Sequence, residues 1–396
     1  MDLKTLVAKH RDRIITIRRD LHQIPETAYT EENTSAYVAE CLRRESLLEV
    51  QTGLAQYGIA ARLKTGKPGP TLMVRADMDA LPIQEETGHA FASGHAGRMH
   101  ACGHDGHMAM VLGAVSVLTE IKDALRGTII FIFQPAEEDI GGAKPMIDAG
   151  VLDDPRVDYA VGCHLWPALP EGQIGVRAGP LMAAMDRFEL TIIGKSGHGA
   201  MPHQCVDALD VGCQVINSLQ RVVSRQMNPL CPTVLTIGSF QAGTAFNIIP
   251  GKAQMSGTTR TFDRDIWESW EQRLRQIVGG LCDAMGASYA LNYQRLYPPT
   301  VNDAWMADVV RRCAGHVVSP ANVIEPEQTM TGEDMAFYLE RVPGCFFFLG
   351  AGREGAAPLH NAHFDFNEAI MLSGVETYCR VALELLSGEN STKAGN

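Results

Sequence analysis

The chain has 396 residues, 45% of them hydrophobic, and its formal net charge is −12 at pH 7. This length exceeds the size at which one core usually stops growing, so we expect two domains, and the hydrophobic content excludes a disordered chain. The negative charge disfavours nucleic acid and anionic membranes as partners. An anionic substrate would therefore need a local positive site.

Cysteine usage and the apolar runs predict a soluble cytoplasmic protein. Ten cysteines are too sparse for a disulfide scaffold, and none of them forms a CxxC pair. The opening stretch MDLKTLVAKHRDR is charged and amphipathic, unlike a signal peptide. The longest apolar runs, such as TIIFIF, are far shorter than the ~18 residues of a membrane-spanning helix.

The first half of the chain alternates predicted helices with predicted strands. Apolar residues at helical spacing predict one helix over residues 3–24, which Pro25 ends, and a second helix in TSAYVAECLRR. Further helices are predicted in MAMVLGAVSVLTEIK and MIDAGVL, and strands in GIAARLK, TLMVRADMD, GTIIFIFQPAEE and YAVGCHLW. Because these strands include runs that are apolar on both faces, they indicate a largely parallel sheet between helical layers.

The pattern changes near Ala183. From there to residue 298 the predicted order is strand, helix, strand, strand, helix, strand, which is the split ferredoxin-like unit. One of these strands is NIIPGKAQMSGTTRTF. The α/β pattern then resumes with AWMADVVRRCAGHV, GCFFFLGAG and a final helix from Asn367 onward. We therefore predict an α+β domain over 183–298, inserted between two parts, 1–182 and 299–396, of one α/β domain.

Six residues of types that can bind metals lie near the ends of predicted elements. Cys102 and His104 lie in a loop before a predicted helix, and Glu137, Glu138, His164 and His360 come at or after the ends of three predicted strands. Polar groups at the carboxyl ends of parallel strands build the site of an open α/β sheet, so we expect them to converge. Thiolate, imidazole and carboxylate are all metal ligands, and this set exceeds what one tetrahedral ion needs. Two ions that share ligands are the economical interpretation, and such pairs suit amide or ester hydrolysis.

The tandem glutamates and three further residues of this region have open roles. Side chains of adjacent extended residues point to opposite faces, so one of Glu137 and Glu138 can bind metal while the other acts as general base. His107 could cap the following helix or support the ligands. Asp77 and Asp79 could orient metal-bound histidines, which usually donate a hydrogen bond to a carboxylate.

A set of motifs resembles the metal-dependent amidohydrolases that include hippurate hydrolase, bacterial N-acyl-amino-acid deacylases and plant auxin-conjugate hydrolases. The motifs are HQIPE, RADMDALPIQEETG, MHACGHDGHMA, QPAEE with GGAKPMIDAGVL, GCHLWP, SGHGAMPH, FNIIP and TGEDMAFYLERVPGCFFFLG. They keep this order from about residue 13 to 385 and are more specific for the family than for the substrate. The resemblance implies a zinc-exopeptidase-like α/β catalytic domain with an inserted ferredoxin-like lid and dimerisation domain.

The resemblance also implies roles for single residues. Glu137 matches the general base, and five residues match the two-metal ligand set: Cys102, His104, Glu138, His164 and His360. His198 matches a lid histidine that stabilises the oxyanion, in related enzymes from the partner subunit of a dimer. Asn247 and Arg260 match lid residues that hold the substrate's carboxylate, and a hairpin could bring both to one edge of the lid.

The implied activity is hydrolysis of N-acyl-L-amino acids with two divalent ions, in a homodimer or larger homo-oligomer. The Cys102 thiolate favours zinc by its softness, whereas members of this branch are often described with manganese, nickel or cobalt. Two alternatives stay open. One is a dipeptidase or carboxypeptidase on the same scaffold, and the other is a metal-binding homologue without catalysis, against which the intact Glu137 argues.

Overall fold

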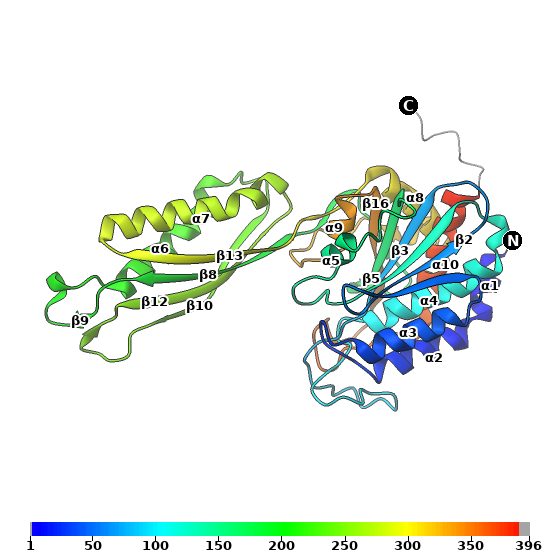
Figure 1. The fold of residues 1–396 in the computed structure, drawn as a ribbon, viewed down its shortest axis with the longest axis horizontal. Coiled ribbons are helices and arrows are strands. Elements are labelled where there is room, and N and C mark those ends of the chain that lie inside the picture. The colour runs from blue at the N-terminus through cyan, green and yellow to red at the C-terminus, as the bar shows by residue number, and fades with distance from the viewer. Residues whose placement is uncertain (1, 388–396) are drawn as a thin grey trace. The chain divides into compact units, whose positions relative to one another are not determined.

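The computed structural model describes residues 2–387. The chain forms two compact units. Unit 1 comprises residues 1–179, 301–327 and 334–396, and unit 2 comprises residues 180–300 and 328–333. Figure 1 shows the helices and strands of both units in chain order.

Unit 1 is built on an eight-stranded mixed sheet in the order β1-β2-β4-β3-β5-β16-β6-β15. Its strands are β1 (Leu48–Leu54), β2 (Gly58–Lys64), β3 (Thr71–Asp77), β4 (Thr128–Gln134), β5 (Tyr159–Pro170), β6 (Ile174–Gly175), β15 (Val323–Ile324) and β16 (Gly344–Gly352). The central strands β4, β3, β5 and β16 are parallel to one another. They are buried along most of their length, which explains their continuous apolar runs and confirms the predicted sheet.

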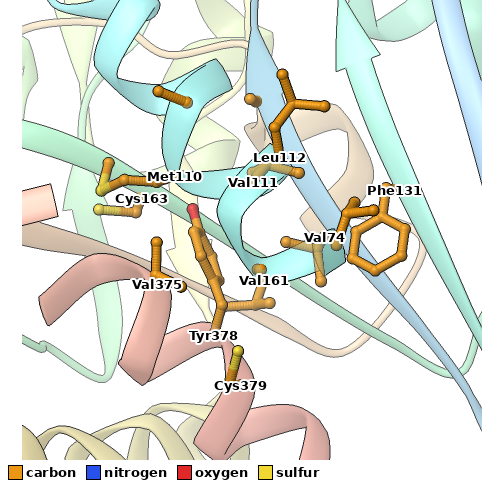
Figure 2. Packing of buried hydrophobic residues seen from close by; sticks show 14 of the residues in the cluster. Val74, Met110, Val111, Leu112, Phe131, Val161, Cys163, Val375, Tyr378 and Cys379 are labelled. Atoms are coloured by element: carbon orange, nitrogen blue, oxygen red, sulfur yellow. The ribbon is translucent and has the colours of Figure 1, made fainter. Parts of the chain in front are cut away.

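Helices enclose the hydrophobic core of unit 1. They are α1 (Leu3–Lys9), α2 (Arg11–His22), α3 (Glu32–Arg43), α4 (His104–Glu120), α5 (Ala143–Asp148), α8 (Ala304–Val318), α9 (Ala336–Leu339) and α10 (Met371–Leu386). Helix α4 is buried over most of its length because it packs against the sheet, α2 and α10. In Figure 2, Tyr378 of α10 points toward Met110 of α4 and Cys163 of β5. This packing fixes the N-terminal end of α4 beside the sheet.

Two details of unit 1 differ from the sequence prediction. The single helix expected over residues 3–24 is two helices, because the chain leaves the helical conformation at His10. The His10 ring instead lies 2.8 Å from the carboxylate of Glu120 at the end of α4. Strand β1 is absent from the predicted elements because it is an edge strand whose residues are mostly exposed or half-buried, so it shows no continuous apolar run.

Unit 2 contains a four-stranded antiparallel sheet in the order β10-β12-β8-β13. Its elements are β8 (Ala184–Ile193), α6 (Ala208–Arg221), β10 (Thr233–Ala242), β12 (Lys252–Thr261), α7 (Arg264–Met285) and β13 (Ser288–Tyr297). Helices α6 and α7 contact each other and both pack on β12, so they cover the same face of the sheet. This order and sheet are those of the predicted ferredoxin-like unit.

The remaining elements are short. They are β7 (Gly179–Met182), β9 (Gly197–His198), β11 (Ile248–Ile249), β14 (Thr300–Asn302) and the single turns η1 (Lys122–Ala124), η2 (Pro202–Gln204), η3 (Val222–Gln226), η4 (Pro320–Asn322) and η5 (Glu368–Ile370). The strand predicted in NIIPGKAQMSGTTRTF is divided at Pro250, which cannot donate to a ladder, into β11 and β12.

The cysteines and the helices agree with two simple expectations from composition. All ten cysteines are free thiols, as their spacing predicts. Within residues 2–387, no helix is both long and apolar enough to span a membrane.

Candidate metal centre

The carboxyl ends of the parallel strands and the start of α4 bring the five predicted metal ligands of unit 1 together. Two groups of three residues share Cys102, and in each the ligand atoms lie within 4.8 Å of one another: Cys102 with His104 and His164, and Cys102 with Glu138 and His360. Cys102 Sγ is 3.4 Å from His164 Nε2, and Glu138 Oε1 is 3.2 Å from His360 Nε2. Four separate stretches of sequence thus supply one cluster.

Backbone carbonyls orient two of the imidazoles toward this cluster. His104 donates from Nδ1 to the carbonyl oxygen of Asp79 at 2.8 Å, and His164 donates from Nδ1 to the carbonyl oxygen of Leu165 at 2.7 Å. Each ring therefore turns its Nε2 into the cluster. His104 Nε2 and Glu138 Oε1 are buried without a hydrogen-bond partner and lie 3.8 Å apart. Buried polar atoms are rarely left unpaired, so these atoms fit a bound cation.

The charge balance of the cluster also fits a cation. Burial and the carboxylates of Glu138 and Glu137 raise the pKa of the Cys102 thiol well above its usual value. A thiol in such a place becomes a thiolate ligand only when a positive ion offsets the carboxylates. The carboxylates and the thiol together therefore favour a cation in the space that they surround.

The pKa values of the buried imidazoles of His164 and His104 are shifted in opposite directions. Burial and the neighbouring His107 lower the pKa of His164 to about 3, so this ring is neutral, as a ligand must be. Burial opposes the charge of His104 as well, but the carboxylate of Asp77 overcomes it and raises the pKa of His104 to about 10. A metal ion bound at His104 Nε2 would take the place of that proton.

His107 and Asp77 support the ligands instead of joining them. His107 donates from Nδ1 to Asp77 Oδ1 at 2.7 Å, and its Nε2 accepts the backbone N–H of Leu165 at 2.9 Å. Both ring nitrogens are therefore occupied, and the ring ties α4 to β5 next to His164. The second oxygen of Asp77 accepts from Arg75 at 2.8 Å.

Asp79 fixes the turn that carries the tandem glutamates. Its two carboxylate oxygens accept the backbone N–H groups of Glu137 and Glu138, each at 2.9 Å. The Glu137 side chain is buried, and its carboxylate lies within 4.8 Å of ligand atoms of His104 and Glu138. A carboxylate held there is placed to move a proton beside the cluster.

Two groups of buried ion pairs near the cluster were not predicted from the sequence. Arg75 donates to Asp334 at 2.7 Å, and Gln134 donates to the same carboxylate at 2.7 Å. Behind α4, Asp105 accepts from Arg18 and from His22, each at 2.8 Å. One signal in the sequence could have indicated these ion pairs. A charged residue within an otherwise apolar strand, such as Arg75 in TLMVRADMD, needs a buried partner.

The candidates in unit 2 do not form one group. His198 pairs with Ile248 in the β9–β11 ribbon, and the Asn247 carbonyl accepts the backbone N–H of Gly199 at 2.8 Å. Arg260 lies near the opposite end of β12, eight residues beyond Lys252, which corresponds to about 26 Å of strand. The expectation that a hairpin brings Asn247 and Arg260 to one edge is therefore wrong within one chain.

His198 and Arg260 each present an unused donor. His198 Nδ1 accepts the backbone N–H of Ala200 at 3.0 Å, so the neutral ring carries its proton on Nε2. Arg260 is partly buried, and its side chain makes no hydrogen bond or ion pair within residues 2–387. Burial lowers the pKa of Arg260, and the charge of Asp186 opposes this effect. Asp186 itself is occupied by Trp267, Tyr293 and Leu296.

A cluster of thiol, imidazole and carboxylate at the strand ends of an α/β sheet, with a further glutamate beside it, defines the class as a hydrolase of the metallopeptidase type. The chain belongs to Peptidase family M20/M25/M40, whose model matches residues 73–384. This confirms the resemblance found in the sequence, and with its named relatives it makes the chain a hydrolase that acts on amide bonds.

Three similar proteins illustrate this membership. The N-acyl-L-amino acid amidohydrolase of Geobacillus stearothermophilus is 47% identical over 302 residues, which cover 76% of this chain and 81% of the relative. Thermostable carboxypeptidase 1 of Saccharolobus solfataricus is 39% identical over 389 residues, which cover 96% and 98%. The crystal structure of a Bacillus subtilis protein, described as a dinuclear metal binding peptidase from the M20 family, matches with a TM-score of 0.82 at 34% identity, covering 96% and 99%.

Proposed function

We propose that this chain hydrolyses N-acyl-L-amino acids to a carboxylate and a free amino acid. Arg260 carries this proposal. A partly buried guanidinium without a directly paired anion is unfavourable until one binds, and an α-carboxylate matches its forked donors. In a chain of net charge −12, such an unpaired cation is the local positive site that an anionic substrate needs.

We further propose that two divalent ions bind the two groups that share Cys102. When bound, these ions would polarise the acyl carbonyl and acidify the attacking water. Zinc suits the thiolate and imidazole donors by softness, and manganese, nickel and cobalt are the alternatives. This proposal is supported by four donors: the Cys102 thiol, the Nε2 atoms of His104 and His164, and the buried Oε1 of Glu138.

The side chains of this protein perform the proton transfers and the orientation of the substrate. Glu137 removes a proton from the water whose oxygen forms the new bond to the acyl carbon, and then delivers that proton to the amine as the C–N bond breaks. His198 donates from Nε2 to the developing oxyanion. Arg260 holds the α-carboxylate as a bidentate fork.

The distance along unit 2 between Arg260 and the pair His198 and Asn247 supports a homodimer or larger homo-oligomer. Since about 26 Å of strand separates Arg260 from the end that carries His198 and Asn247, one copy of unit 2 cannot bring all three to one small substrate. Two copies can, with His198 and Asn247 supplied by the second chain. The exposed hydrophobic side chains beside them, Phe246 and Ile248, are of the kind that a subunit contact covers.

A carboxypeptidase activity is the second candidate, favoured by the relative named for it. A substrate panel separates the two. The protein is loaded with zinc, manganese, nickel or cobalt and assayed on N-acetyl and N-benzoyl amino acids, their methyl esters, and dipeptides. We expect hydrolysis of the N-acyl amino acids above that of the esters and dipeptides. Faster cleavage of dipeptides favours the second candidate, and equal rates on acids and esters overturn the role of Arg260.

A further inference from the structure

The residue before the tandem glutamates has an unfavourable backbone conformation. Ala136 has a φ of 57°, in the left-handed region that residues with a Cβ rarely adopt. It is fully buried and stands between the end of β4 and Glu137. Such a conformation persists only when surrounding contacts enforce it, and it is concentrated at functional sites. The backbone of Ala136 therefore contributes to the direction in which Glu137 leaves the chain.

Three successive backbone N–H groups of this turn donate to buried carboxylates. The N–H of Ala136 donates to Glu31 Oε1 at 2.8 Å, and the next two donate to the oxygens of Asp79. Glu31 comes from a distant segment, at the start of α3, and is fully buried. Hydrogen bonds to carboxylates are stronger than those between neutral groups, so this arrangement is a restraint on the turn.

The local structure of α3 does not account for the burial of Glu31. Although Glu31 occupies the N-cap position, its side chain makes no capping hydrogen bond. Its second oxygen, Oε2, is buried without a hydrogen-bond partner, and burial together with Asp79 raises the pKa of Glu31 to about 7. A buried carboxyl group is costly, and the oxygen Oε1 of Glu31 accepts the backbone N–H of Ala136.

We propose that Glu31 is a positioning residue for Glu137, acting through the left-handed conformation of Ala136. This inference rests on the proposed role of Glu137 as general base. Without an acceptor at Glu31, the buried N–H of Ala136 loses its partner and the backbone relaxes toward a commoner φ, which rotates Glu137 away from the reacting water. Asp79 still holds the N–H of Glu138, so metal binding persists while proton transfer is impaired.

Two conservative variants of Glu31 test whether the length of its side chain, rather than its charge, is needed to hold the N–H of Ala136. Glu31→Gln keeps an oxygen at the same distance along the side chain, and we expect a kcat within about threefold of wild type. Glu31→Asp keeps the carboxylate but is one methylene shorter, and we expect kcat to fall by about 10²-fold, the scale of a 1 Å misplacement, with KM and metal content unchanged. The control is Glu32→Asp, because Glu32 is the exposed neighbour of Glu31.

A double variant tests the part played by Ala136. Glycine adopts a positive φ without steric cost, so Glu31→Asp with Ala136→Gly should recover part of the lost kcat. The inference is overturned if Glu31→Asp keeps the wild-type kcat, if it loses metal in proportion to activity, if Glu31→Gln is equally impaired, or if the double variant recovers nothing. Glu137→Gln is measured beside them. A normal kcat in that variant overturns the general base itself, whereas a low kcat there with a normal Glu31→Asp overturns this inference alone.

Discussion

The candidate residues of unit 1 and unit 2 are held in opposite ways. In unit 1 the candidate ligands Cys102, His104 and His164 are buried, and the carbonyl groups of Asp79 and Leu165 hold the two imidazoles. In unit 2, His198 and Asn247 are exposed, and the Arg260 side chain makes no hydrogen bond or ion pair among the described residues. A preorganised cluster is suited to bind ions and direct charge, whereas residues with free donors are suited to contact a substrate or another chain.

Removing a ligand from the preorganised cluster should have the largest effect. Cys102 belongs to both groups of candidate ligands, so Cys102→Ala should lose metal and activity together. The control is Cys282→Ala, because Cys282 is also a buried thiol but packs in the core of unit 2. Elemental analysis of the loaded wild type should give two ions for each chain. Full activity with one ion would contradict the two-metal proposal.

Substitutions of the two tandem glutamates should impair different properties, kcat for Glu137 and metal affinity for Glu138. Glu137→Gln should keep metal and substrate binding but lose at least ~10²-fold in kcat, the scale of a positioned base. Glu138→Gln should bind metal more weakly, because it removes a donor oxygen from the cluster. Metal titration and steady-state kinetics on the same samples separate the two phenotypes. Swapped results would reverse the assignment of the two side chains.

A mixed dimer tests whether His198 acts on the partner chain. His198→Ala should lower kcat by about 10²-fold, as for the loss of one oxyanion donor. When His198→Ala chains are coexpressed with Glu137→Gln chains, one site of each hybrid dimer has an intact Glu137 and an intact His198 only if the histidine crosses between chains. We therefore expect activity in the isolated hybrid well above that of either parent. Absence of this recovery would place His198 at the site of its own chain.

Arg260 should affect substrate binding more than the chemical step. Removing a charged hydrogen bond costs about 1.5–3 kcal/mol, so Arg260→Ala should raise KM for N-acyl amino acids by at least about tenfold. Arg260→Lys should restore part of this loss, because lysine keeps the charge but not the fork. Kinetics on the matching methyl esters should differ little between wild type and Arg260→Ala. Unchanged kinetics on the acids would remove the case for a free α-carboxylate.

The sequence predicts the convergence of the candidate metal ligands and the presence of the inserted unit. Glu138 and His360 follow the parallel strands β4 and β16, and they converge with His164 of β5 and with Cys102 and His104 at the start of α4. The rule that sites form at the carboxyl ends of parallel strands needs no side-chain detail. The inserted unit is predicted from periodicity alone, since its strands and helices bury one face and leave the other more exposed.

The sequence does not predict features that depend on single backbone angles or on distant pairs. The role of His107 is settled only by the N–H of Leu165, and that of Glu31 only by the N–H of Ala136. The short ribbon of β9 and β11 places Asn247 at the end of the sheet opposite to Arg260. Spacing along the chain gives no measure of this separation, which is set by the direction of β12.

The smallest expected effect concerns the stability of the preorganised unit at high pH. Burial opposes the charge of His22, but Asp105 and Glu85 overcome it and raise its pKa to about 9 from an ordinary value of 6.5. A raised histidine pKa contributes stability that is fully present below pH 6.5 and is lost as the pH rises through 9. The difference corresponds to at most about 3 kcal/mol, and less if the denatured chain retains the contact.

Thermal denaturation of the metal-free protein at pH 6 and pH 9.5 measures this contribution. Asp105 and Glu85 stay ionised throughout, because their pKa values are lowered by the same cluster, that of Glu85 to about 2. The wild-type midpoint should therefore fall by a few degrees more between the two pH values than that of His22→Gln, which has no proton to lose. Unit 2 holds no such buried histidine among its described residues, so the pH-dependent part should appear in the transition of unit 1. Equal falls in the two proteins would show that His22 is neutral in the folded state, and that the contact with Asp105 does not need its charge.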